Sequence, residues 1–188
     1  IMPLTKLNAT QGLTGTLPAV SGANLTGISA GITMADQWRL STTFSGNANP
    51  IVSNWERVDA TARLQGTIGS AMSVDGSGYW TFPSTGIYLV AFKCNYALNG
   101  DDRSISSWIY ATNDNSSYNA TAWSTAFLQQ TNSNYTGSSA YVETLVDVTN
   151  TSNDKIYFRI SVQNSSTEIQ GNTNESLTFA TFTRIGDT

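Results

Sequence analysis

Residues 79–96 read "YWTFPSTGIYLVAFKCNY", and this stretch decides the fold class. A short apolar run ends at Phe82, and residues 83–86 supply a proline, a serine and a glycine that favour a turn. Beyond the turn, large apolar side chains occupy every second position: Tyr88, Val90, Phe92, Cys94 and Tyr96. The residues between them are Ile87, Leu89, Ala91 and Lys93. A period of two predicts a long β-strand with one face in a core.

The same alternation recurs along the chain on both sides of this stretch. An Asn-Gly pair at residues 99–100 predicts a hairpin turn. Further strands are expected near residues 38–44, 103–112, 123–129, 139–148, 155–163 and 176–185. About eight to ten antiparallel strands without a convincing helix indicate an all-β sandwich or barrel. The spacing alone leaves the strand connections open.

The composition agrees with strands and turns. The chain has 188 residues, with 26 Thr, 23 Ser, 17 Asn and 15 Gly, and only 12% of its residues are charged. The net charge of -4, without a basic cluster, argues against nucleic-acid binding. No apolar run approaches the roughly 18 residues of a membrane span, so a membrane partner and a secretory leader are not expected. The chain opens with Ile1, which indicates a processed protein or a piece of a longer one.

Catalytic chemistry has little support. The chain contains no histidine, which excludes the usual general base, Ser-His and Cys-His nucleophiles and His-containing zinc sites. Cys94 is the only cysteine and is expected to be a small buried apolar residue. Acid pairs such as Glu56 with Asp59, or Glu143 with Asp147, could serve a glycan-degrading enzyme. Their spacing does not distinguish them from scattered surface acids, so we expect no enzyme.

The N-terminal passage has a different texture. Residues 12–28 read "GLTGTLPAVSGANLTGI", in which the triplet LTG occurs twice. Glycine and proline break any regular face, so the apolar residues need partners from elsewhere. These residues are Leu13, Leu17, Leu25 and Ile28. We expect an extended spacer at residues 1–33 and a β-rich head at residues 34–188.

The head resembles a known family. An aromatic residue, a proline, a glycine and a tyrosine before an alternating strand are similar to the core signature of the globular head of the first complement component and of tumour necrosis factor. Those positions are Phe82, Pro83, Gly86 and Tyr88, followed by Val90 and Phe92. The resemblance covers residues 34–188 and implies a jelly-roll fold of ten strands that assembles as a homotrimer. Two positions depart from the family pattern, because Ala180 and Asn153 stand where glycines are common.

The spacer resembles the segment that precedes the head domains of bacteriophage tail fibres. This resemblance implies three parallel copies whose leucines meet on a common axis, whereas the alternative is a linker with two chance LTG copies. It implies an extracellular virion appendage that contacts other virion proteins on its N-terminal side and a host surface receptor, glycan or protein, during adsorption. Alternatives are a purely structural capsid-decoration or fibre-joining protein, a polysaccharide-degrading enzyme and a secreted carbohydrate-binding module.

The stretches "NDNSSYNATAW" and "NSNY" place aromatic residues among amides and acids. Aromatic faces stack on sugar rings, and amides and carboxylates bond their hydroxyl groups. The candidate glycan-binding residues are Asn113, Asp114, Asn115, Tyr118, Trp123 and Tyr135. The alternative is a hydrophilic loop beside a strand core, and for Trp123 we favour the core. Trp38, Trp80 and Trp108 are expected to pack within or between subunits.

A metal is the one cofactor considered. Asp101 and Asp102 lie side by side at the hairpin turn, where carboxylates and carbonyl groups could hold calcium. No full series of oxygen ligands follows at a fixed spacing, so an ordinary solvated turn is the favoured alternative. No other cofactor is expected.

Overall fold

Strand β6, Gly86–Leu98, lies at the centre of the larger sheet, where it pairs with three other strands. Its alternating side chains bury one face of the strand in the core. The computed structural model describes residues 31–188. In it, the side chains of Tyr88, Val90, Phe92, Cys94 and Tyr96 are all 0% exposed. The expected long strand and its core face are confirmed.

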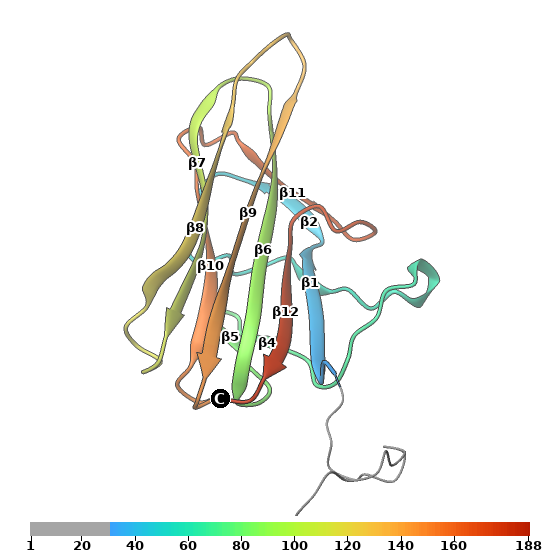
Figure 1. Ribbon diagram of the computed structural model, residues 1–188. Helices are drawn as coiled ribbons and strands as arrows, with labels where there is room; N and C mark the ends of the chain where they lie inside the picture. The colour runs from blue at the N-terminus through green and yellow to red at the C-terminus, as the bar shows by residue number, and fades with distance from the viewer. Residues whose placement is uncertain (1–30) are drawn as a thin grey trace, which may run out of the picture. The chain divides into compact units, whose positions relative to one another are not determined.

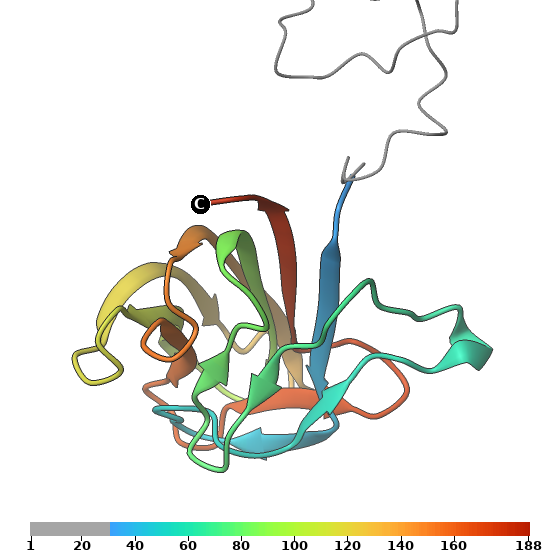
Figure 2. The ribbon, with the colours of Figure 1, turned by 90° about the horizontal axis from the view of Figure 1, so that it is seen from below.

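The described residues contain twelve strands and one short 3-10 helix. Figure 1 shows how the strands are arranged. The larger sheet contains β1 Met34–Leu40, β2 Thr42–Ser45, β3 Trp55–Arg57, β6, β9 Thr136–Val148, β11 Glu168–Asn172 and β12 Phe179–Gly186. The smaller sheet contains β4 Ser73–Val74, β5 Trp80–Thr81, β7 Asp102–Thr112, β8 Asn119–Leu128 and β10 Lys155–Ser161. The short helix is η2, Thr61–Arg63, and lies in a segment that reaches away from the sheets (Figure 2). No helix among the described residues is long and apolar enough to cross a membrane.

The connections are those of a jelly roll. Strand β7 pairs with β8, β6 with β9, β5 with β10, and β1 with β12, all antiparallel. Each of these pairs encloses the previous one along the chain. The inner three alternate between the two sheets, and β2–β11 and β1–β12 both belong to the larger sheet. The expected all-β jelly-roll fold is confirmed.

The turn before β6 explains the Pro-Gly-Tyr signature. The Tyr88 hydroxyl donates to the carbonyl of Ser84 at 2.9 Å, and the Phe82 and Tyr88 rings lie 4.7 Å apart. Gly86 has a φ of +140°, and a Cβ there would lie 2.4 Å from Nε of Arg184. The same Nε donates to the carbonyl of Thr85 at 2.9 Å. Only glycine leaves room for this contact between the turn and the last strand.

The core between the sheets is built on aromatic rings. Trp80 is 0% exposed and its ring lies within 6 Å of four others, in edge-on and tilted contacts: Trp38, Trp55, Phe158 and Phe182. Such geometries stabilise aromatic pairs beyond the area that they bury. Packing is confirmed for Trp38 and Trp80. The spacer contacts expected at Leu13, Leu17, Leu25 and Ile28 lie outside the described residues.

Candidate functional site

Aromatic side chains cover the outer face of the smaller sheet. Strands β7, β8 and β10 turn their aliphatic residues inward, so the alternate positions point away from the core. There the structure gathers Tyr79, Trp108, Tyr110, Tyr118, Trp123, Tyr157 and Arg159, which we call the aromatic face. The strands' pairing creates this face from segments that are far apart in sequence.

The strand register arranges the aromatic face in two rows. In the first row Trp123 of β8 pairs with Trp108 of β7, which pairs with Arg159 of β10. The two indole rings stack at 4.8 Å with an interplanar angle of 12°. The Arg159 guanidinium lies 5.7 Å from the Trp108 ring centroid and donates to the Tyr110 hydroxyl at 3.0 Å.

The second row lies two residues further along the strands. Tyr110 pairs with Tyr157, and their rings stack at 4.8 Å with an interplanar angle of 6°. Tyr118 stacks on Tyr79 at 4.9 Å and lies 5.2 Å from Tyr157. Partial burial raises the pKa of the Tyr118 phenol from its usual 10 to about 12.

Trp123 is the most accessible member of the aromatic face. Its side chain is 57% exposed, although it lies in the middle of a strand. Because β8 is the edge strand of its sheet, no further strand of the chain's described part pairs beyond it. The expectation that Trp123 belongs to the core is therefore wrong. Stacking on Trp108 holds one indole face, and the opposite face is left to solvent.

The acidic turn next to this face is shaped by its own hydrogen bonds. The Asp114 carboxylate accepts bonds from the Thr112 hydroxyl and from the amides of Ser116 and Ser117. The Thr112 hydroxyl, followed by these amides, holds the pKa of Asp114 well below its usual range. Asn115 has a φ of +55°, a conformation that asparagine tolerates.

Asn113 belongs to the same turn but borders a surface other than the aromatic face. It lines an open depression together with Asn119, Thr121 and Asp147. Asn113, Asp114 and Asn115 thus belong to one turn at the end of the aromatic face, whereas Tyr118 and Trp123 belong to the face itself.

Tyr135 lies apart from the other predicted ligand residues. It precedes β9 in the β8–β9 loop, at the end of the sandwich opposite to the β7–β8 turn (Figure 1). Its side chain is 63% exposed, and its hydroxyl donates to Glu168 at 3.2 Å. The structure therefore does not bring Tyr135 together with Tyr118 and Trp123.

The two adjacent aspartates differ in their surroundings. Asp102 is 1% exposed and accepts bonds from the amides of Ser104, Gln163 and Asn164 and from the Thr167 hydroxyl. Asp101 is exposed and accepts the amide of Gln130 at 2.6 Å. No group of three or more acidic, histidine or cysteine side chains suited to a metal occurs among residues 31–188. Calcium stays a prediction, and the protein's own donors already occupy the carboxylate of Asp102.

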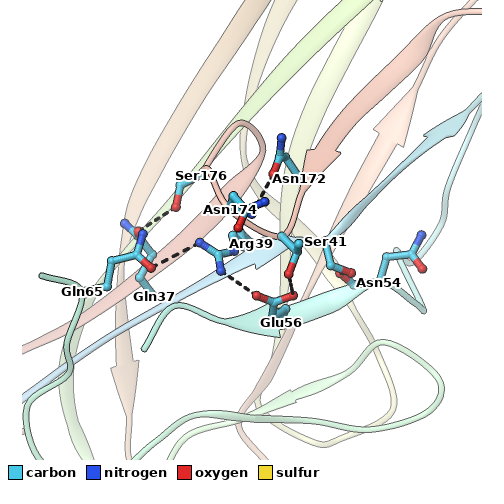
Figure 3. Close-up of polar contacts among 10 residues, drawn as sticks. Gln37, Arg39, Ser41, Asn54, Glu56, Gln65, Asn172, Asn174 and Ser176 are labelled. Atoms are coloured by element: carbon cyan, nitrogen blue, oxygen red, sulfur yellow. Dashed lines mark hydrogen bonds and ion pairs between the residues drawn. The ribbon is translucent and has the colours of Figure 1, made fainter. Parts of the chain in front are cut away.

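The acid pairs considered for an enzyme have other contacts. Arg39, 2% exposed, donates to Glu56 at 2.6 Å and to Gln65 at 3.3 Å (Figure 3). The Thr173 hydroxyl donates to the second oxygen of Glu56, and this bond, followed by that from Arg39, lowers the pKa of Glu56. A general acid needs the opposite shift. On β9, Glu143 accepts a bond from the Tyr141 hydroxyl at 2.7 Å.

A second exposed surface lies on the outer side of the larger sheet. Tyr141 and Leu145 of β9 are 53% and 60% exposed in the middle of a regular strand. Leu145 pairs with Leu89 of β6, which pairs with Thr183 of β12. The outward positions of β6 and β9 also carry Lys93, Glu143 and Asp147. We call four apolar residues among them the apolar strip: Leu89, Ala91, Tyr141 and Leu145.

Sequence reasoning missed most of the aromatic face. It identified Tyr118 and Trp123, but it assigned Trp108 to packing and gave no role to Tyr79, Tyr110 or Tyr157. One signal was available in residues 103–112. Large side chains occur there on both faces of the expected strand, with Trp108 and Tyr110 on the face opposite to Ile109. That signal could not show that β10 and β8 would flank this strand.

Comparisons with known proteins support the fold. No protein-family model matches the chain, and no curated protein matches it either. Among solved structures, the chain is similar to an Eiger TNF from S. frugiperda, with a TM-score of 0.58 and 15% identity over 84% of this chain and 95% of that one. It is also similar to murine APRIL, with a TM-score of 0.56 and 12% identity over 81% of this chain and 98% of that one. At these identities the likeness concerns the fold, and it agrees with the jelly roll expected from the Pro-Gly-Tyr signature.

Proposed function

We propose that this chain is the head of a virion appendage, a non-enzymatic homotrimer that binds glycan on the host surface through its aromatic face. The proposal is carried by the exposure and stacking of Trp123. This residue is 57% exposed, and its ring stacks on that of Trp108. An indole in a fixed orientation offers a sugar ring a flat apolar surface at little cost in conformational entropy. Fold likeness alone does not specify a ligand, so the ligand class is inferred from the chemistry of this surface.

The surroundings of Trp123 suit an uncharged, hydroxyl-rich ligand. The neighbouring outward position of β8 carries Thr125, and the second row adds phenol groups. These groups donate and accept hydrogen bonds, as sugar hydroxyls do. A shallow open surface of this kind binds each copy of a ligand weakly.

Three linked heads raise a weak affinity through avidity. The apolar strip supports self-association, because full burial of a leucine stabilises a protein by about 1.5–3 kcal/mol and Leu145 is left mostly exposed by a single chain. The resemblance to the complement and tumour necrosis factor heads also implies a trimer. We further propose that residues 1–33 connect this trimer to other virion proteins.

Glycan binding is tested with the full chain on an array of neutral and acidic oligosaccharides. We expect Trp123→Ala to abolish binding. Tyr135→Ala removes an aromatic side chain of similar exposure at the other end of the head and should leave binding intact. The absence of any bound saccharide, or undiminished binding by Trp123→Ala, would overturn the proposal.

The virion assignment has an independent test. An antibody against the chain should label purified particles of the virus that encodes it in negative-stain micrographs and should block adsorption. Unlabelled particles and unaffected adsorption would refute the assignment without bearing on glycan binding.

A further inference from the structure

The outer side of the smaller sheet carries positive charge, and its strands expose no carboxylate there. Strands β4, β5, β8 and β10 contain no carboxylate, and the only one in β7, Asp102, is buried. The cations Lys155 and Arg159 lie at outward positions of β10. This is unexpected in a chain with a net charge of -4.

Arg159 lies at the junction of two kinds of surface. On one side is its own row, which ends in the exposed ring of Trp123. On the other side the register continues with Ser161, Ser106 and Thr125, a row of hydroxyl groups. The guanidinium is therefore bordered by an aromatic surface and by hydroxyl donors and acceptors.

The guanidinium also has donors to spare. Its one side-chain hydrogen bond among residues 31–188 goes to the Tyr110 hydroxyl, and it forms no ion pair with any described carboxylate. Arginine presents five N–H donors in a fork that matches carboxylate and sulfate oxygens. The guanidinium carbon lies 5.7 Å from the Trp108 ring centroid, within the range of a cation–π interaction.

The nearest acids lie in turns beyond the strands. Asp75 and Asp114 belong to the turns at the Tyr118 end, where both act on the Tyr118 phenol. Asp101 lies at the opposite end, beside Arg103. The row that contains Arg159 lies between these ends, so an anionic group placed there meets a cation and no carboxylate of the face.

We infer that the aromatic face recognises an acidic saccharide, with a carboxylate or sulfate group bound by Arg159 while the sugar ring stacks on Trp123. This inference rests on the proposed glycan binding and specifies its ligand class. Arg159 supplies the charge selectivity, and Trp123 supplies contact that any sugar shares.

The test compares probes that differ in one group. Binding of the full chain to oligogalacturonate, to its methyl ester and to dextran sulfate is measured by calorimetry, with dextran as the neutral counterpart of the sulfate. We expect the acid to bind about tenfold or more tightly than the ester, since a hydrogen bond to a charged group is stronger than one to a neutral group. The carboxylate and sulfate arms identify which anion the site prefers.

Variants assign the effect to Arg159. Arg159→Gln should reduce the preference for the acid over the ester to about onefold, and Arg159→Lys should retain part of that preference. Arg63→Gln, which removes one positive charge from the exposed η2 segment, should behave as the wild type. Thermal unfolding of each variant identifies any loss due to misfolding.

Three results would overturn the inference. Equal affinity for acid and ester, with both lost in Trp123→Ala, would leave glycan binding standing and remove the acidic selectivity. A preference for the acid that Arg63→Gln weakens as much as Arg159→Gln would reflect net charge alone. If none of these probes and no array saccharide binds, the proposed function fails as well.

Discussion

Two tryptophan-to-alanine changes in the same sandwich should have opposite consequences for stability and binding. Trp80 is 0% exposed and contacts aromatic rings from both sheets, whereas Trp123 is 57% exposed and stacks on one ring. If the aromatic face is a binding surface, Trp123 should contribute little to folding and much to the ligand. Trp80 should show the reverse.

The magnitudes follow from burial. Truncating a fully buried tryptophan costs about 3–5 kcal/mol of unfolding free energy, because a large cavity remains. The Trp80 indole N–H has no hydrogen-bond partner among residues 31–188, so the loss is one of packing. For Trp123, burial of less than half its side chain contributes about 1 kcal/mol and the stack with Trp108 about 0.5–1.5 kcal/mol.

The assay is guanidinium chloride unfolding of the full chain, followed by far-UV circular dichroism so that loss of a fluorophore does not bias the signal. We expect the midpoint of Trp80→Ala to fall well below that of Trp123→Ala at similar m-values. Equal losses of about 4 kcal/mol for both variants would refute the reasoning, because Trp123 would then be a structural residue.

Two further predictions concern charged groups. Asp102→Ala should lower the unfolding free energy by about 3 kcal/mol with or without calcium, because it leaves buried donors such as the Thr167 hydroxyl unsatisfied, and Asp101→Ala should change it little. A melting temperature that rises with calcium in the wild type, and not in these variants, would instead support the calcium prediction. Glu56 has a lowered pKa in the folded state, so its stabilising effect is present above its usual value of 4.5 and is lost as the pH falls through the lower folded value. The stability difference between wild type and Glu56→Gln should therefore disappear in acid, and a pH-independent difference in chemical unfolding would contradict this.

Much of the fold could be predicted because it depends on local patterns. The alternation from Tyr88 to Tyr96 specified a buried strand face, and the turn before it required the small residue at Gly86. The strand connections were beyond this reasoning, because they depend on pairing between β5 and β10 or β1 and β12, which are far apart in the chain.

The candidate site shows the same division. Tyr118 and Trp123 were identified from composition, but Arg159 and Trp108 join them only through the register of three strands. Tyr135 was grouped with them because it is close in sequence, and the length of β8 carries it to the other end of the sandwich. The period of two showed which residues share a face but not which strand lies beside it.

Self-association is the central claim, and sedimentation velocity of the full chain at micromolar concentration tests it most directly. We predict a single species with three times the 20.2 kDa mass of the chain. Leu145→Arg places a charge in the apolar strip and should shift this species towards the monomer, whereas Arg63→Gln should not. A wild-type chain that sediments as a stable monomer would contradict the account.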